Sequence, residues 1–293
     1  MSTRKWITAA LAALLGLCVL LAILVMACAP RTETADVAIL MYHAFTEGEA
    51  DTGSLYTPAS EFERQLSALR DAGYTSVGYA DLIEFVNGKG ELPEKPLLIS
   101  IDDGYQNNLD LAAPLLETYG FCANIAVIGV SIGRTTYKDT DIPITPHFSL
   151  EDARPWIERG VLTVTTHSYD MHQIAAVDGD DCRRGVLQMP GEAEPDYIAA
   201  LTQDYTHAQE QLAGLPGKVL PVFTYPFGAY SELSERVLQE QGVQVTVTIA
   251  DGANRLVKGE PETLRLLRRI HVWHGTKPDM LLSRIDAALQ ALR

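Results

Sequence analysis

Two adjacent carboxylates, Asp102 and Asp103, end the apolar stretch Pro-Leu-Leu-Ile-Ser-Ile-Asp-Asp-Gly. At the end of a buried strand two such groups repel each other, and burial removes the water that stabilises each charge. A bound cation would offset this cost by taking one carboxylate as a ligand, and the other would remain free to accept a proton from water. The pair is therefore a candidate for metal-assisted hydrolysis.

Two histidines, His167 and His172, follow another apolar run in the stretch His-Ser-Tyr-Asp-Met-His. Five residues apart, they would lie about 140° apart around a helix and could not share one face. No glutamate lies between them either, which excludes the His-Glu-x-x-His pattern of helical zinc peptidases. Two histidines and one carboxylate with an open fourth position make a catalytic zinc site. We therefore expect one divalent metal per chain, with zinc as the expected ion.

Short apolar runs alternate with amphipathic stretches along the chain, which predicts parallel strands connected by helices. The expected fold is α/β, a distorted or incomplete (β/α) barrel with seven to eight parallel strands, preceded by an N-terminal hydrophobic helix. The expected strands cover residues 37–43, 97–102, 123–129, 161–166, 219–224 and 243–249, with 268–272 as a further candidate. In a barrel, chemistry gathers at the C-terminal ends of the strands, which is where the aspartates and histidines fall.

The N-terminus carries Arg4 and Lys5 followed by an uncharged apolar run from Trp6 to Ala29, which is long enough to span a membrane. The run ends in Val-Met-Ala-Cys, and Cys28 resembles the lipidated residue of a bacterial lipoprotein. A membrane anchor, a lipoprotein signal and a cleaved secretory signal all place the protein outside the cytoplasm; a buried core helix is the remaining alternative. The expected organisation is a signal or anchor over 1–28, a linker over 29–36 and a catalytic domain over 37–293.

The charge balance excludes some partners. The chain has 293 residues, with 23 Lys and Arg against 38 Asp and Glu, and a formal net charge of −15. Such an acidic surface argues against nucleic acid and anionic lipid headgroups, because both are polyanions. It is compatible with a neutral sugar polymer, and it predicts no particular oligomeric state.

The ordered motifs resemble those of the polysaccharide deacetylases, carbohydrate esterase family 4 with its NodB-like domain. The resemblance of Ser-Ile-Asp-Asp-Gly implies that Asp102 is the base and Asp103 a metal ligand, and that His167 and His172 are the other ligands. The histidine motif is one residue longer than the usual family pattern, which resembles the branch acting on poly-N-acetylglucosamine. The opening strand, Ile-Leu-Met-Tyr-His with His43, is also typical of the family.

A third motif, Thr-Tyr-Pro-Phe-Gly at 224–228, resembles the family's Arg-Pro-Pro-Tyr/Phe-Gly. It implies that the backbone N–H of Phe227 helps to form an oxyanion hole. Thr224 replaces the family's arginine, and Arg269 is expected to supply that charge. The family's late histidine, the general acid, has no clear match; His271 and His274 are candidates. The residues expected to contact substrate are His43, Tyr105, Tyr225, Gly228 and His271.

The resemblance implies a hydrolase acting on non-peptide carbon–nitrogen bonds, which removes N-acetyl groups from an N-acetylglucosamine-containing surface polysaccharide. Peptidoglycan and acetyl-xylan are alternative substrates, and substrate choice would lie in the loops 134–147 and 178–196. A non-catalytic sugar-binding surface lipoprotein on the same fold is an alternative of another class. The presence of both aspartates and both histidines favours the enzyme.

Overall fold

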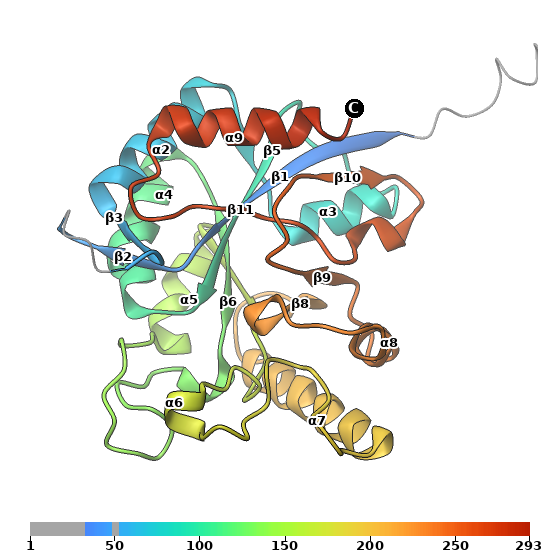
Figure 1. Cartoon of the computed structure of the whole chain (residues 1–293). Helices are drawn as coiled ribbons and strands as arrows, with labels where there is room; N and C mark the ends of the chain where they lie inside the picture. Colours follow the sequence, from blue (N-terminus) through green and yellow to red (C-terminus); the bar gives the residue numbers. More distant parts are fainter. Residues whose placement is uncertain (1–32, 49–52) are drawn as a thin grey trace, which may run out of the picture. The chain divides into compact units, whose positions relative to one another are not determined.

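The computed structural model describes residues 33–48 and 53–293. Its main feature is a sheet whose strands are drawn as arrows in Figure 1. The sheet has nine strands in the order β10-β1-β5-β6-β7-β8-β9, with β4 beside β5 and β11 beside β1. Strand β10 runs antiparallel to β1, and the other pairings in this sheet are parallel. The strands are β1 (Thr34–Tyr42), β4 (Thr75–Ser76), β5 (Pro96–Asp103), β6 (Ala123–Val127), β7 (Leu162–Thr166), β8 (Val222–Thr224), β9 (Val245–Val247), β10 (Asn254–Val257) and β11 (Ile270–His271). A separate parallel pair joins β2 (Ala44–Thr46) to β3 (Tyr56–Pro58).

The segment 267–271 pairs with the edge strand β9 and then with β1, so it connects two strands that are far apart in the sheet order. Leu267 forms a parallel bridge with Val247 of β9, and Ile270 and His271 then pair with Leu40 and Met41 of β1. The expected α/β fold, an incomplete barrel of mostly parallel strands, is thus confirmed. The expected N-terminal hydrophobic helix lies outside the described residues. Within the residues that the structure describes, no helix is long and apolar enough to cross a membrane.

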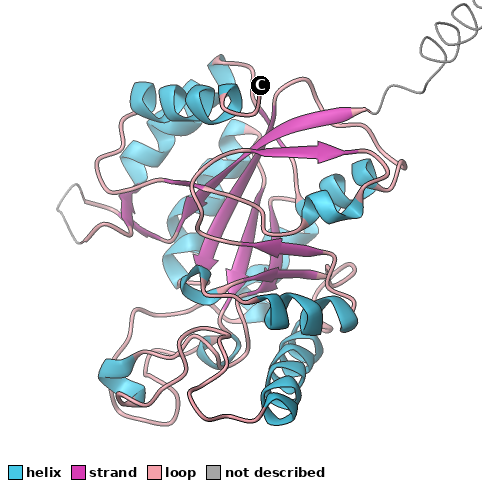
Figure 2. Ribbon diagram, turned by 45° about the vertical axis from the view of Figure 1, so that its right-hand side comes forward, coloured by secondary structure: helices cyan, strands magenta, loops and turns pink. Residues whose placement is uncertain are grey.

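Helices cover the sheet, as Figure 2 shows with helices in cyan and strands in magenta. They are α2 (Ala59–Asp71), α3 (Tyr79–Val86), α4 (Ala113–Tyr119), α5 (Leu150–Glu158), α6 (Ala175–Asp178), α7 (Glu194–Leu212), α8 (Glu232–Glu240) and α9 (Pro278–Gln290), with a π-helical turn (Asn108–Ala112) before α4. Ser149 and Ser231 are the N-cap residues of α5 and α8, and their side chains accept backbone N–H bonds from the first turn of each helix.

Both faces of the central strands are apolar because both are packed. On β1, Leu40 points to a cluster with Phe62 of α2 and Leu281 of α9. Its neighbour Ile39 points the other way, to a cluster that includes Leu82 of α3. Alternation along a strand sends successive side chains to opposite faces, so a strand buried on both faces reads as an unbroken apolar run.

Two features differ from the sequence-based expectations. Strand β1 begins at Thr34 rather than at Val37, because its first residues pair with β10 and Arg255 makes a two-point ion pair with Asp36 (2.7 and 2.8 Å). The end of the expected linker is therefore part of the sheet. Helix α3, with only eight residues, was not expected from the pattern of apolar residues.

Candidate active site

The chemistry-bearing residues meet at the C-terminal ends of parallel strands. Asp102 and Asp103 end β5, His43 follows β1, and His167 follows β7. Phe227 lies in the turn after β8. This is the end of a parallel barrel at which loops can bring side chains from several strands to one point.

Asp103, His167 and His172 form a cluster that can hold a metal ion. One ligand atom from each residue lies within 4.8 Å of the other two. The Oδ1 atom of Asp103 is 3.7 Å from the Nε2 atom of each histidine. This oxygen is buried, and no atom of the described residues forms a hydrogen bond with it. A buried carboxylate oxygen facing two imidazole nitrogens fits a divalent cation, since no lysine or arginine of the described residues is paired with this carboxylate.

The protonation state of His167 suits a ligand. Its Nδ1 atom donates a hydrogen bond to the backbone oxygen of Thr224 at 2.8 Å, since a carbonyl can only accept. Burial lowers the pKa of His167 to about 4, so the imidazole is neutral near pH 7 and its Nε2 atom carries a lone pair. A backbone acceptor of this kind fixes the ring orientation that a metal site needs.

The chain returns from His167 to His172 through a tight turn. Ser168 has a positive φ of 73°, and its hydroxyl accepts the N–H of Met171 at 3.1 Å. The carboxylate of Asp204, on α7, accepts the N–H groups of the next two residues, Tyr169 and Asp170, at 2.9 and 2.7 Å. Burial raises the pKa of Asp204 to about 6. Asp204 thus holds the backbone between the two histidines in place through these two hydrogen bonds. The sequence around Asp204 contains no motif that would predict this role.

Asp102 has its own cation within the chain. The Nη1 atom of Arg269 donates to Oδ1 of Asp102 at 2.7 Å and to the hydroxyl of Ser100 at 3.0 Å, while Nε donates to the backbone oxygen of Thr248 at 2.8 Å. Arg269 is fully buried. Burial alone would raise the pKa of Asp102, but the Arg269 guanidinium and the nearby histidines hold it well below its usual range. Asp102 is therefore an ionised carboxylate at neutral pH.

The glycine of the Asp-Asp-Gly motif is required by the backbone. Asp103 and Gly104 have φ angles of 73° and 85°, in the left-handed region. A Cβ atom on Gly104 would lie 2.8 Å from Cγ1 of Val127 on the neighbouring strand. The chain therefore turns sharply after β5, and the turn directs Asp103 toward the histidines.

The turn after β8 places Phe227 against the metal cluster. Phe227 has a positive φ of 57°, and its ring lies 4.2 Å from that of His172, measured between centroids. Gly228 also has a positive φ, and a Cβ atom there would lie 2.4 Å from Cγ1 of Ile249. The backbone of this turn therefore requires a glycine at position 228. This requirement explains Gly228 without the substrate contact that was expected of it.

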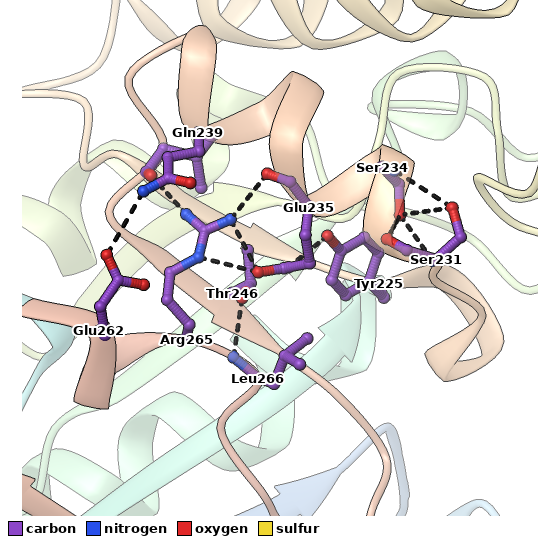
Figure 3. A network of polar contacts seen from close by, with 10 residues as sticks. Tyr225, Ser231, Ser234, Glu235, Gln239, Thr246, Glu262, Arg265 and Leu266 are labelled. Carbon is purple, nitrogen blue, oxygen red and sulfur yellow. Dashed lines mark hydrogen bonds and ion pairs between the residues drawn. The ribbon is translucent and has the colours of Figure 1, made fainter. Parts of the chain in front are cut away.

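Tyr225 does not reach the site surface, contrary to the sequence-based expectation of a substrate contact. Its side chain is fully buried and its hydroxyl donates to Glu235 at 2.5 Å. Arg265 holds Glu235 from the other side, with hydrogen bonds to its carboxylate at 2.9 Å and its backbone oxygen at 3.0 Å (Figure 3). Tyr225 therefore stabilises the turn that carries Phe227, because its hydrogen bond to Glu235 connects this turn to α8.

Two further histidines lie in different surroundings. His271 is half-buried, burial lowers its pKa to about 4, and its buried Nε2 atom has no partner among the described residues. The Nδ1 atom of His274 instead donates to the backbone oxygen of Tyr56 at 3.2 Å. Of the two candidates for the general acid, His271 is thus the one with a buried ring nitrogen that has no hydrogen-bond partner among the described residues.

Tyr105 and His147 complete one wall of the site. Their rings lie 4.8 Å apart, and His147 is 8% exposed. Burial, and after it the charge of Asp103, raises the pKa of Tyr105 well above its usual range, so its hydroxyl stays protonated. His147 was not among the expected site residues, since it stands alone at the end of a long loop with no motif around it.

Comparison with known proteins agrees with the motifs. Residues 89–246 match the family described as polysaccharide deacetylase, which is just over half of the chain. YxkH of Bacillus subtilis is 26% identical over 264 residues, which cover 90% of this chain and 80% of YxkH. A poly-beta-1,6-N-acetyl-D-glucosamine N-deacetylase of Staphylococcus aureus is 21% identical over 196 residues, 66% of this chain and 61% of that protein. The Escherichia coli enzyme of the same name is 31% identical over 100 residues, 34% of this chain and 15% of that protein.

Solved structures share the fold. A de-N-acetylase from Aggregatibacter actinomycetemcomitans superposes with a TM-score of 0.72 at 18% identity, covering 85% of this chain and 100% of that one. IcaB from Ammonifex degensii superposes with a TM-score of 0.66 at 22% identity, covering 87% and 97%. With the family match over residues 89–246, the chain belongs to the polysaccharide deacetylase family.

Proposed function

We propose that this protein is a metal-dependent hydrolase that removes N-acetyl groups from an N-acetylglucosamine-containing surface polysaccharide. The observation that carries the proposal is the contrast at the end of β5. Asp102 is ionised and paired with Arg269, whereas a buried oxygen of Asp103 faces two histidine nitrogens. The names of the Staphylococcus aureus and Escherichia coli relatives support an N-acetylglucosamine polymer as the substrate class.

Asp103, His167 and His172 are the residues that would hold the metal. When bound there, a divalent cation, for which we propose zinc, polarises the acetyl carbonyl and makes water more acidic. The tautomer of His167, set by its bond to Thr224, presents the nitrogen that such an ion needs. Asp102 keeps its own hydrogen bonds to Arg269 and is left for proton transfer.

The remaining steps belong to the chain's own groups. Asp102 accepts a proton from water as the water oxygen bonds to the acetyl carbon. The backbone N–H of Phe227 donates to the acetyl oxygen as that oxygen becomes negative, and one such donor contributes about 3 kcal/mol in other hydrolases. The carbon–nitrogen bond then breaks, acetate leaves, and a proton moves to the sugar nitrogen. His271 is our candidate for relaying this proton from Asp102 to the sugar nitrogen. Burial lowers its pKa to about 4, so the ring is neutral near pH 7 and takes up a proton only during the reaction, and its buried Nε2 atom is unpaired within the described structure.

The test is release of acetate by the full-length protein in mild detergent, with zinc and an N-acetylglucosamine tetramer. We expect acetate and a free amine in equal amounts, loss of activity with a chelator, and recovery when zinc is added back. No acetate from this tetramer, from peptidoglycan or from acetylated xylan, despite bound zinc, would instead indicate a sugar-binding protein. Acetate from only one of the other two polymers would move the proposal to that substrate.

We further propose that residues 1–28 tether the protein at the outer face of a membrane. The support is the uncharged apolar run after Arg4 and Lys5, and it comes from the sequence alone. Intact-mass spectrometry and cell fractionation of the parent and of Cys28→Ser together separate the two kinds of tether. A lipoprotein loses its lipid mass in the variant, whereas an anchor helix remains in the membrane. Recovery of the parent in the cytoplasmic fraction would contradict the proposal.

A further inference from the structure

A cavity of about 230 Å³ lies beside the metal cluster, and we call it the side pocket. Its walls include His172, a proposed metal ligand, and Tyr105, two residues after Asp103. We infer that the side pocket binds a second, uncharged sugar ring of the polymer, next to the unit that loses its acetyl group. The inference rests on the proposed function, because it names the substrate feature that the same site would recognise.

The size of the side pocket argues for a ring rather than for the acetyl group. An engineered protein cavity of about 150 Å³ is large enough to bind benzene. A cavity of about 230 Å³ therefore accommodates a six-membered ring with several substituents. An acetyl group has only three heavy atoms and would leave most of this volume unfilled, at the cost of lost dispersion contacts.

The lining has the mixed chemistry of a sugar. Ile128, Ile144 and Ile174 provide apolar surface for the C–H faces of a pyranose. Ser131 and Thr145 add hydroxyls, and His147 adds an imidazole whose buried Nδ1 atom has no hydrogen-bond partner in the described part of the chain. Such a pocket, largely apolar with a few placed polar groups, is typical of small-molecule sites.

Charge argues for a neutral ring. Among the lining residues that the structure describes there is no lysine, arginine or carboxylate, so an acidic sugar would lose its hydration without gaining a cation from them. The nearest lysine of the surrounding loop, Lys138, is already paired with Asp170 at 2.7 Å and with Asp178 at 2.9 Å. An N-acetylated hexosamine is uncharged and meets this condition.

The side pocket is built before any ligand arrives. Its two loops, 134–147 and 170–178, are joined by the ion pairs of Lys138 and by a hydrogen bond from the Tyr137 hydroxyl to Asp178. Asp178 also accepts the N–H of Ile174 at 2.7 Å, which fixes the wall beside His172. A preformed pocket loses little conformational entropy on binding, so its contacts contribute more of their energy to affinity.

The test compares a filled pocket with a matched surface change. Ile144→Trp places an indole in the side pocket, while Ile142→Trp places one two residues away at a position that is 46% exposed and outside the lining. We expect Ile144→Trp to lower kcat/KM for the N-acetylglucosamine tetramer at least tenfold, mainly through KM, and to lower it at least tenfold more for the tetramer than for the single sugar. Ile142→Trp should change neither. If Ile144→Trp does not fold, Ser131→Leu fills the same pocket with a smaller group.

Two results would overturn the inference. Equal loss on tetramer and single sugar would show that the pocket recognises no second ring. A larger loss on N-butanoyl than on N-acetyl substrates would assign the pocket to the acyl group instead. Calorimetric binding of the tetramer to the zinc-loaded protein separates this inference from the proposed function. Tenfold weaker binding by Ile144→Trp would support the side pocket even if no acetate were released, and unchanged binding would contradict it.

Discussion

The two neighbouring carboxylates at the end of β5 lie in opposite electrostatic surroundings. Asp102 points to the barrel interior, where the buried Arg269 donates to it at 2.7 Å. Asp103 turns toward the loops, where one of its oxygens is buried without a hydrogen-bond partner in the described structure and faces His167 and His172. Asp102 is thus paired with a guanidinium of the chain, whereas Asp103 has no ion pair with a lysine or arginine among the described residues. Adjacent residues of one type can therefore serve different chemical roles because a single turn separates their environments.

The largest effect should come from exchanging each carboxylate for its amide. Asp102→Asn removes the proton acceptor and keeps the shape, so we expect kcat to fall by about 10³-fold while one zinc per chain remains bound. Asp103→Asn should instead abolish stoichiometric zinc binding, measured by metal analysis after dialysis. Asp139→Asn, at a carboxylate that is 95% exposed, is the matched control. Loss of zinc in Asp102→Asn would show that the two carboxylates share the metal.

The next largest effect should come from removing Arg269, the cation that is paired with Asp102. Arg269→Met leaves Asp102 buried without its partner, and breaking a buried ion pair costs about 3–5 kcal/mol. Denaturant unfolding of the metal-free protein should show this loss, whereas Arg268→Met, at an exposed position, should change stability little. Adding Asp102→Asn to Arg269→Met should restore part of the stability, because no uncompensated charge then remains. A double variant no more stable than Arg269→Met would contradict the pairing.

The features that could be predicted from the sequence are those that a short stretch of consecutive residues specifies. The apolar run into Asp102 and Asp103 predicts both the strand and its polar end. The expected partnership of Arg269 with Asp102, 167 residues apart, came from the family resemblance and agrees with the geometry. The strands were predictable because burial on both faces leaves unbroken apolar stretches.

Two residues have roles that the sequence did not predict, because those roles depend on contacts with residues that are distant in the sequence or on the packing of the core. Asp204 lies mid-helix with nothing to distinguish it from other acidic helix residues, yet it accepts two N–H groups from a loop 34 and 35 positions earlier. Tyr225 sits within a motif, which suggested a substrate contact, but its alternation along the chain sends the ring into the core. Local sequence shows that a residue is polar or aromatic, and only the packing shows which side it faces.

A smaller effect should follow from releasing the turn that carries the histidines. Asp204→Ala leaves the N–H groups of Tyr169 and Asp170 without their acceptor, so His172 is held less firmly beside Asp103. Loss of such supporting bonds in metal sites weakens binding about 10–100-fold. A zinc competition titration should show this change, while Asp196→Ala, an exposed acid on the same helix, should bind as the parent does. Parental affinity in Asp204→Ala would assign Asp204 to the stability of α7 alone.

The smallest effect should be a pH dependence in the absence of metal. Burial lowers the pKa of His167 to about 4 in the folded chain, against about 6.5 when unfolded. Between these values the unfolded chain binds more protons, so the free energy of unfolding falls as pH is lowered, by at most about 1.4 kcal/mol per pH unit from this group.

Denaturant unfolding of chelator-treated protein at pH 6.5 and 5.5 gives the total slope, to which Asp204 contributes with the opposite sign because burial raises its pKa to about 6. The difference between the parent and His167→Gln isolates the His167 contribution, and the variant's free energy of unfolding should fall less as pH is lowered. Added zinc should shift the pH range in which the free energy of unfolding falls to lower pH, because zinc and the proton compete for Nε2 of His167. An unchanged slope in His167→Gln would mean that the proton enters elsewhere. His271, whose pKa burial also lowers to about 4, would then be the group to replace next.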